Sequence, residues 1–210
     1  TPKPSSAASD VYKRQSLRRA QQAMQSGVLA AEIVPVTVKT RQGDIQVSED
    51  EQPLNARIDK ITSLKPAFSK DGSITAANAS SISDGASALL LMTAEQARSR
   101  GLNPLARIVA HSTQSQDPSE FTIAPIGAIS KVLHRAGWQK DEVDLFEINE
   151  AFAMVTMLAM REHDLDHAKV NIYGGACAQG HPVGSPGSRI IVTLINAPVS
   201  YTHLTLPTKA

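Results

Sequence analysis

The stretch GGACAQGHPVGSPG, at residues 174–187, decides how this chain is interpreted. It contains five of the twelve glycines, the only cysteine (Cys177) and His181. Glycines allow tight turns and let a ligand approach the backbone closely. A loop imidazole can act as a base or donate a hydrogen bond near neutral pH, whereas a histidine before proline can also be an ordinary turn residue. Spacing alone leaves both interpretations of His181 open.

The same loop does not match the common nucleotide-binding patterns. The spacing of Gly180, Gly184 and Gly187 is not GxGxxG, and the GK[ST] ending of a phosphate-binding loop is absent. Cys177 lies between two alanines, which is more typical of a small buried residue than of a nucleophile. No cluster of carboxylates and histidines has the spacing of a metal site, so we expect none.

Length and composition exclude several classes of protein. The 210 residues suit one domain or two small ones, and the net charge of +1 gives no indication of nucleic acid or an anionic membrane as a partner. There is no apolar run long enough to span a membrane and no apolar core of a signal peptide. A single cysteine excludes an internal disulfide framework. We therefore expect a cytoplasmic protein.

The two ends of the chain are related at the level of DNA. A DNA element that encodes SSAASDVYKRQ, at residues 5–15, has a reverse complement that encodes VSYTHLTLPT, which stands at residues 199–208. The two bases of the reverse complement that precede this reading frame complete a proline codon, and Pro198 stands at that position. The element resembles a transposase-type sequencing adapter. We therefore expect residues 1–15 and 198–210 to be artefact tails around a sequence that is cut at both ends.

Between these tails, strand and helix patterns alternate, which is typical of a layered α/β fold. Strands are predicted at residues 31–47 (two strands turning at Gln42 and Gly43), 87–93, 104–113, 143–148 and 169–175, and helices at 17–27, 94–101, 124–137, 149–163 and 187–196.

Two further parts of the sequence contain candidate functional residues. Asn149 follows a predicted buried strand and opens a predicted helix. It could cap that helix, or its amide could point from the strand end into a crevice, where open α/β sheets bind ligands. The string TAANASSISDGAS, at residues 75–87, suits either a tight turn or a surface that admits a flat or extended ligand. The patterns alone leave these alternatives open.

Three strings, in this order and spacing, resemble the thiolases: ANASSISDGA (77–86), NEAFA (149–153) and GGACAQGHPVGSPGSR (174–189). The resemblance implies a thiolase-like layered α/β/α/β/α fold that is incomplete in this chain. It also implies a division of the chain into the end of a loop domain (16–66), the last part of an N-terminal core domain (67–102) and the first part of a C-terminal domain (103–197).

The resemblance implies an acyltransferase of the acetyl-CoA C-acetyltransferase type. Thiolases cleave 3-ketoacyl-CoA with CoA, or run the reverse Claisen condensation, through an acyl-cysteine. CoA thioesters are their substrates, no further cofactor is implied, and they work as homodimers or homotetramers. By resemblance, His181 activates the nucleophile and helps to bind the thioester oxygen, and Asn149 holds a water in the same oxyanion hole. Ser80 lies beside the pantetheine of CoA, and Ala151 and Phe152 line the channel.

The chain also departs from the family pattern. The nucleophilic cysteine belongs to the missing first half, the second cysteine lies beyond the other end, and Cys177 matches neither. Pro186 replaces a small or hydroxyl residue, and Ala77 replaces a usual glycine. We therefore expect this chain alone to be inactive. The alternatives are a non-catalytic thiolase-like protein that binds acyl-CoA or lipid and, less favoured by the NEAF and GHPVG strings, a 3-ketoacyl synthase.

Overall fold

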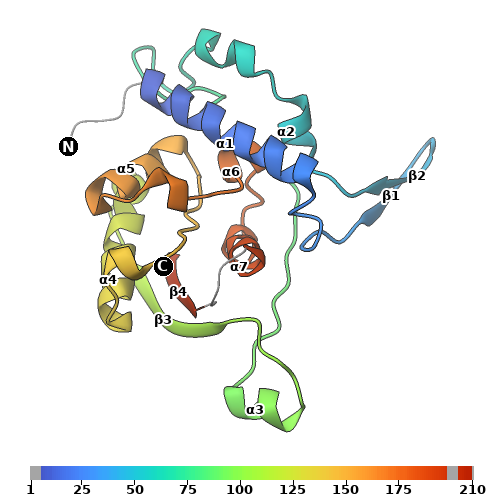
Figure 1. The fold of residues 1–210 in the computed structure, drawn as a ribbon. Helices are drawn as coiled ribbons and strands as arrows, with labels where there is room; N and C mark the ends of the chain where they lie inside the picture. The colour runs from blue at the N-terminus through green and yellow to red at the C-terminus, as the bar shows by residue number, and fades with distance from the viewer. Residues whose placement is uncertain (1–5, 198–202, 210) are drawn as a thin grey trace.

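The computed structural model describes residues 6–197 and 203–209. Parts of both predicted tails (residues 1–5, 198–202 and 210) lie outside the described residues. The helices are α1 (Ser6–Ser26), α2 (Glu51–Asn55), α3 (Ala94–Ser99), α4 (Ala124–Ala136), α5 (Ala153–His163), α6 (Ala176–Gln179) and α7 (Pro186–Asn196). Short 3-10 helices are η1 (Ile58–Ser63), η2 (Pro118–Ile123), η3 (Lys140–Glu142) and η4 (His167–Lys169). The strands are β1 (Val36–Thr40), β2 (Gly43–Val47), β3 (Arg107–Gln114) and β4 (His203–Lys209) (Figure 1).

The predicted helix ends are confirmed where glycine or a capping side chain sets them. Helix α4 ends at Gly137, which adopts the left-handed conformation with φ 70°. Helix α3 begins after Thr93, whose side chain accepts a hydrogen bond from the backbone N–H of Gln96. Helix α1 ends before Gly27 as expected but starts earlier than predicted, at Ser6, because no glycine or proline interrupts residues 6–16.

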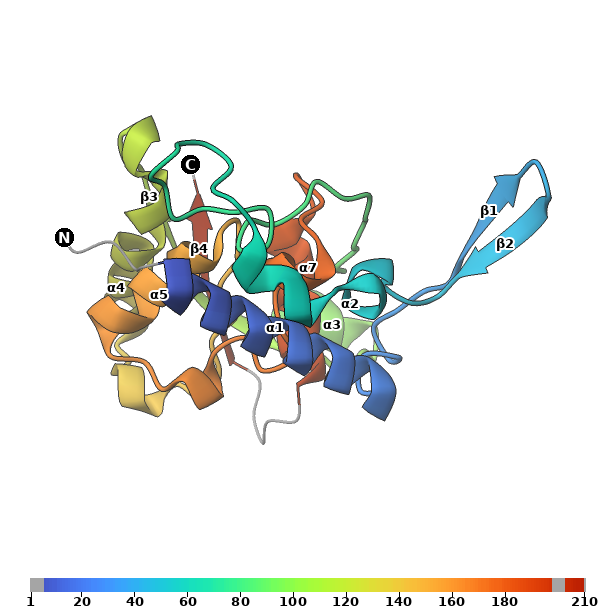
Figure 2. The same ribbon diagram turned by 90° about the horizontal axis from the view of Figure 1, so that it is seen from above.

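The predicted hairpin is also confirmed. Strands β1 and β2 pair antiparallel, with Thr40 opposite Gly43. Gly43 has φ 121°, a conformation open to glycine, and Thr40 Oγ1 donates to its carbonyl at 2.7 Å. All residues of both strands are exposed, and the hairpin projects away from the body of the molecule (Figure 2).

At three of the positions where strands were predicted, the structure has no full strand. Residues 87–93 are not assigned to a strand, and Leu90 and Leu91 are 83% and 70% exposed. A strand needs a neighbour that takes up its N–H and C=O groups, and the described part of the chain places none beside this segment. The predicted strands at 143–148 and 169–175 reduce to one parallel bridge between Phe146 and Val170.

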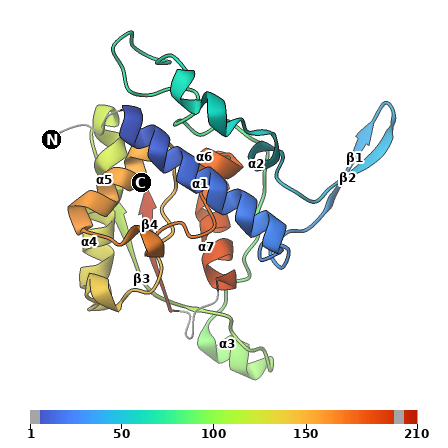
Figure 3. The ribbon, with the colours of Figure 1, turned by 45° about the horizontal axis from the view of Figure 1, so that its top comes forward.

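The remaining strand, β3, is confirmed and pairs in parallel with β4. Helix α4 covers these two strands, as Figures 1 and 3 show. Ser112 on β3 donates its hydroxyl to the carbonyl of Ala128 at 2.7 Å, and Arg135 reaches the carbonyl of His111 at 2.7 Å. Strand β4 falls within the predicted tail at 198–210, so in the described residues the partner of β3 is a segment predicted to be adapter-derived.

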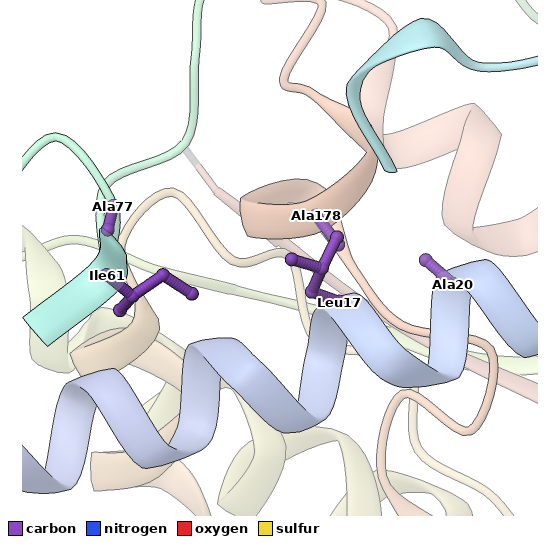
Figure 4. Close-up of a cluster of buried hydrophobic side chains, with 5 residues drawn as sticks. All are labelled: Leu17, Ala20, Ile61, Ala77 and Ala178. Carbon is purple, nitrogen blue, oxygen red and sulfur yellow. The ribbon is translucent and has the colours of Figure 1, made fainter. Parts of the chain in front are cut away.

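Three apolar clusters are buried in the described residues: the smallest contains Tyr12, Ala153 and Cys177, and two larger ones hold these pieces together. One joins α4 and α5 and contains Ile129, Leu133, Ile148, Ala159 and Val170. The other joins α1 to η1, to the string at 77–86 and to α6; it contains Leu17, Ala20, Ile61, Ala77 and Ala178 (Figure 4). Helix α1 therefore brings two of the three singled-out strings to one place. In the part of the chain that the structure describes, no helix has the length and hydrophobicity needed to cross a membrane.

Leu17 is 0% exposed, so Leu17→Ala removes buried methyl groups and leaves a cavity. We expect this change to lower the free energy of unfolding by about 2–5 kcal/mol, as measured by urea denaturation. Val34→Ala is the matched control, because Val34 is 81% exposed, and its effect should be under about 0.5 kcal/mol. Equal losses for the two variants would contradict the assignment of this cluster as core.

Candidate functional site

The three singled-out strings meet through backbone hydrogen bonds. Ala79 forms an antiparallel bridge with Phe152, and the backbone N–H of Ala153 donates to the carbonyl of Asn78 at 2.9 Å. Ile82 forms a parallel bridge with His181, whose backbone N–H donates to the carbonyl of Ser81 at 3.0 Å. Residues 78–82 therefore lie between the NEAFA string and the glycine loop, and they fix both.

Asn149 and His181 face each other at this junction. Asn149 Nδ2 lies 3.4 Å from His181 Nε2, and both residues are half-buried. The prediction that Asn149 opens a helix is wrong, because α5 begins at Ala153 and Phe152 is its N-cap residue. The bridge of Phe152 to Ala79 keeps residues 149–152 out of the helix. Asn149 is therefore not the helix cap, and its amide lies toward His181; that it points into a ligand-binding crevice stays a prediction.

The other predicted site residues lie beside this pair. Ser80 Oγ donates to the carbonyl of Ala151 at 2.7 Å, and the Ser80 backbone N–H donates to the same oxygen at 3.2 Å. The ring of Phe152 lies in a small aromatic group, with centroids 6.0 Å from Phe121 and 6.3 Å from Phe68. The structure therefore brings together all five residues that the sequence singled out.

Glu150 is a central residue that the sequence analysis missed. It is 0% exposed, and its carboxylate accepts hydrogen bonds from four residues of distant segments. The donors are Tyr12 Oη at 2.8 Å, Ser16 Oγ at 2.9 Å, Asn171 Nδ2 at 3.0 Å and the Cys177 backbone N–H at 3.1 Å. A glutamate in an apolar string was the available signal, because glutamate is almost never fully buried unless it is paired.

Cys177 behaves as a structural residue. It is 2% exposed, and its thiol donates to the carbonyls of Glu150 at 3.4 Å and Asn78 at 3.5 Å. Burial raises the pKa of the Cys177 thiol well above its usual range, and the nearby Glu150 raises it further. A thiol in this state is a poor nucleophile, which supports the expectation of a structural role.

The structure explains why two positions of the loop are occupied by glycine, which the sequence analysis did not predict. A β-carbon at Gly174 would lie 2.5 Å from the carbonyl oxygen of Ser16, and one at Gly175 would lie 2.4 Å from Cδ of Glu150. Two of the loop glycines therefore allow close packing against the protein's own α1 and Glu150, rather than against a ligand.

Pro186 fits its position without disturbing the loop. It lies at the first position of α7, where the backbone N–H has no partner within the helix and where the fixed φ of proline is favourable. The replacement noted in the sequence therefore costs no hydrogen bond in this helix.

A second group of ionisable residues surrounds α7. Burial raises the pKa of Glu147 to about 8; Arg189 opposes this shift, and Glu150 and Glu32 add to it. Glu32 accepts a hydrogen bond from Thr193 Oγ1 at 2.9 Å, and burial raises its pKa as well. One oxygen of Glu147 and the Nε of Arg189 are buried without a hydrogen-bond partner in the described residues.

The raised pKa of Glu147 makes the stability depend on pH. The folded state keeps the Glu147 proton up to about pH 8, while the unfolded state loses it near the ordinary value of 4.5, so stability falls as pH rises between them. Glu147→Gln cannot lose a proton there. We expect this variant to have the higher melting temperature at about pH 8 and a flatter dependence from about pH 6.5 to 8. If the melting temperatures of the variant and the unchanged chain depended on pH in the same way, the raised pKa of Glu147 would be contradicted.

Fold and site together define a layered α/β protein in which an imidazole and a carboxamide from two loops meet beside a segment of small residues. Two family profiles match the chain: the N-terminal domain of thiolase over residues 5–95 and the C-terminal domain of thiolase over residues 102–200. The chain belongs to the thiolase family.

Relatives of known name agree with this family. The acetyl-CoA acetyltransferase of Yarrowia lipolytica is 47% identical over 188 residues, which is 90% of this chain and 47% of the relative. The mouse protein called acetyl-CoA acetyltransferase, mitochondrial, is 43% identical over 90% of this chain and 45% of its own length. The chain therefore spans about half the length of the curated relatives it matches. Because the mouse relative is named as mitochondrial, the cytoplasmic location stays a prediction.

Solved structures show the same fold. The acetyl-CoA acetyltransferase of Bacillus anthracis has a TM-score of 0.86 and 44% identity, over 90% of this chain and 48% of that one. A thiolase from Ascaris suum in complex with coenzyme A has a TM-score of 0.86 and 34% identity, over 96% of this chain and 52% of that one. The fold is therefore thiolase-like and partial. The domain boundaries and the adapter origin of the two ends stay predictions.

Proposed function

We propose that the whole protein represented by this chain catalyses thiolysis of 3-ketoacyl-CoA or the reverse Claisen condensation of acyl-CoA. The supporting observation is the 3.4 Å approach of Asn149 Nδ2 to His181 Nε2. When Nε2 carries the proton, it can donate to one oxygen, and the Asn149 amide can hold a water that donates to the same oxygen. A thioester oxygen that becomes an enolate or a tetrahedral oxyanion would be stabilised by such donors.

The same imidazole can also exchange protons with a thiol. A neutral histidine beside a cysteine takes the thiol proton and leaves the thiolate that attacks a thioester. The backbone bond of His181 to Ser81, and the bonds of the Asn171 side chain to Ile148 next to Asn149, keep the two groups from swinging away. Fixed donors of this kind require little reorganisation during the reaction.

Ser80, Ala151 and Phe152 are proposed to contact the arm of CoA. Ser80 uses its hydroxyl hydrogen on the carbonyl of Ala151, so its oxygen still has capacity to accept a hydrogen bond from a pantetheine amide. The Ascaris suum relative, solved in complex with coenzyme A, supports CoA as the ligand. A homodimeric or homotetrameric state of the whole protein is part of the same proposal.

The 210-residue chain is proposed to be inactive by itself. Its single cysteine, Cys177, is buried and has a raised pKa, so the chain offers no accessible thiolate for the acyl-enzyme. The same observation favours a second candidate for this chain, a thiolase-like protein that binds acyl-CoA without turning it over.

The purified chain should therefore bind acetyl-CoA but show no thiolysis of acetoacetyl-CoA.

In the whole protein, we expect His181→Ala to lower kcat by about 10²–10⁴-fold and Asn149→Ala by about 10²–10³-fold, as measured by loss of acetoacetyl-CoA. His134→Ala is the control, because His134 is exposed on α4 and should leave kcat unchanged. Thiolysis by the 210-residue chain, or full activity of the His181 variant, would overturn the proposal.

A further inference from the structure

We propose that Glu150 is a positioning residue whose single buried carboxylate holds Asn149 and His181 in their mutual geometry. The inference rests on the proposed function for its catalytic meaning, but the geometry can be tested without any ligand. Neither residue of the pair contacts the carboxylate directly in the described hydrogen bonds. The carboxylate acts instead on the two backbone segments that carry them.

On the Asn149 side, the carboxylate and its partners hold both neighbours of the asparagine. Asn171 Nδ2 donates to Glu150 Oε1 at 3.0 Å and to the carbonyl of Ile148 at 2.8 Å. Asn171 Oδ1 accepts the backbone N–H of Ile148 at 2.8 Å. Because residues 148 and 150 are both held, the backbone of Asn149 has little freedom to rotate its amide away from His181.

On the His181 side, the carboxylate holds the short helix that precedes the histidine. Glu150 Oε2 accepts the backbone N–H of Cys177 at 3.1 Å, and the Cys177 thiol donates to the Glu150 carbonyl at 3.4 Å. Cys177 belongs to α6, which ends just before Gly180 and His181. The absent side chain at Gly175 lets the carboxylate lie directly on this backbone.

The identity of the side chain matters because every partner is a donor. Hydroxyls of Tyr12 and Ser16, the amide of Asn171 and the N–H of Cys177 all point at the two oxygens. A carboxylate only accepts, so it satisfies all four. A glutamine of the same shape would present an NH₂ group to at least one donor and leave it unsatisfied in the interior. Glu150→Gln therefore tests the role of these four hydrogen bonds while keeping the volume of the side chain.

The first experiment uses the complete 210-residue chain without ligand and records the ring ¹⁵N resonances of its histidines by NMR. In Glu150→Gln we expect the His181 resonances to move toward those of Asn149→Ala, while the resonances of the exposed His134 stay unchanged. Leu29→Ala is the control for simple loss of stability, because Leu29 is 3% exposed and shares no apolar cluster with Ile148 or Cys177. Unchanged His181 resonances in Glu150→Gln, or equal shifts in Leu29→Ala, would overturn the proposal.

A graded variant keeps the test valid if Glu150→Gln does not fold. Ser16→Ala removes one donor to the carboxylate, and Ser16 lies outside the predicted tail at residues 1–15. The His181 resonances should move in the same direction as in Asn149→Ala, by a smaller amount. A folded Ser16→Ala chain whose His181 resonances do not move contradicts the proposal.

The second experiment is a double-mutant cycle read by acetyl-CoA binding. Glu150→Gln should weaken acetyl-CoA binding by about ten-fold in the unchanged chain and by under about two-fold in the His181→Ala background. The second loss is smaller because Glu150 is proposed to affect binding through the position of His181, which that background lacks. Equal fold-losses in both backgrounds would mean that Glu150 only stabilises the fold. If the unchanged chain binds no acetyl-CoA, the proposed binding fails for this chain, and the NMR comparison still decides the role of Glu150.

Discussion

The buried carboxylate of Glu150 is the interaction on which the rest of the site depends. Taking such a group out of water is costly unless hydrogen bonds replace the lost solvation, and here four donors from three separate segments supply them. Each donor is thereby drawn to a common point, so α1, residues 148–150, Asn171 and α6 are ordered together. The position of one side chain links the packing of the core to the placement of the two polar groups beside it.

Local signals in the sequence predicted helix ends where glycines and capping residues set them, but not the short helices α2 and α6. Helices α3 and α4 begin and end where capping residues and glycines indicated, and the β1–β2 hairpin turns at the predicted place. The predicted strand at residues 87–93 is wrong, because a strand forms only when a neighbour accepts and donates its hydrogen bonds. The sequence pattern records which face is apolar, but not whether that neighbour lies beside it.

The candidate site was predictable in part. His181 and Asn149 stand in short strings of specific residues, and the structure brings them within 3.4 Å. The helix start at Asn149 was wrong, because the bridge between Phe152 and Ala79 competes with helix formation there. Glu150 escaped detection because its role exists only after three distant segments, α1, Asn171 and α6, have come together around it. Periodicity measures neighbours along the chain and carries no information about such convergence.

The pairing of β3 with β4 has a practical consequence for work with this protein. A parallel ladder is made of main-chain groups, and here a strand from a string predicted to be adapter-derived occupies the edge of β3. Such pairing does not by itself require particular side chains in the added strand. A purification tag or linker fused after α7 can take the same place, so the solubility and yield of two preparations are comparable only when they share the same C-terminal extension.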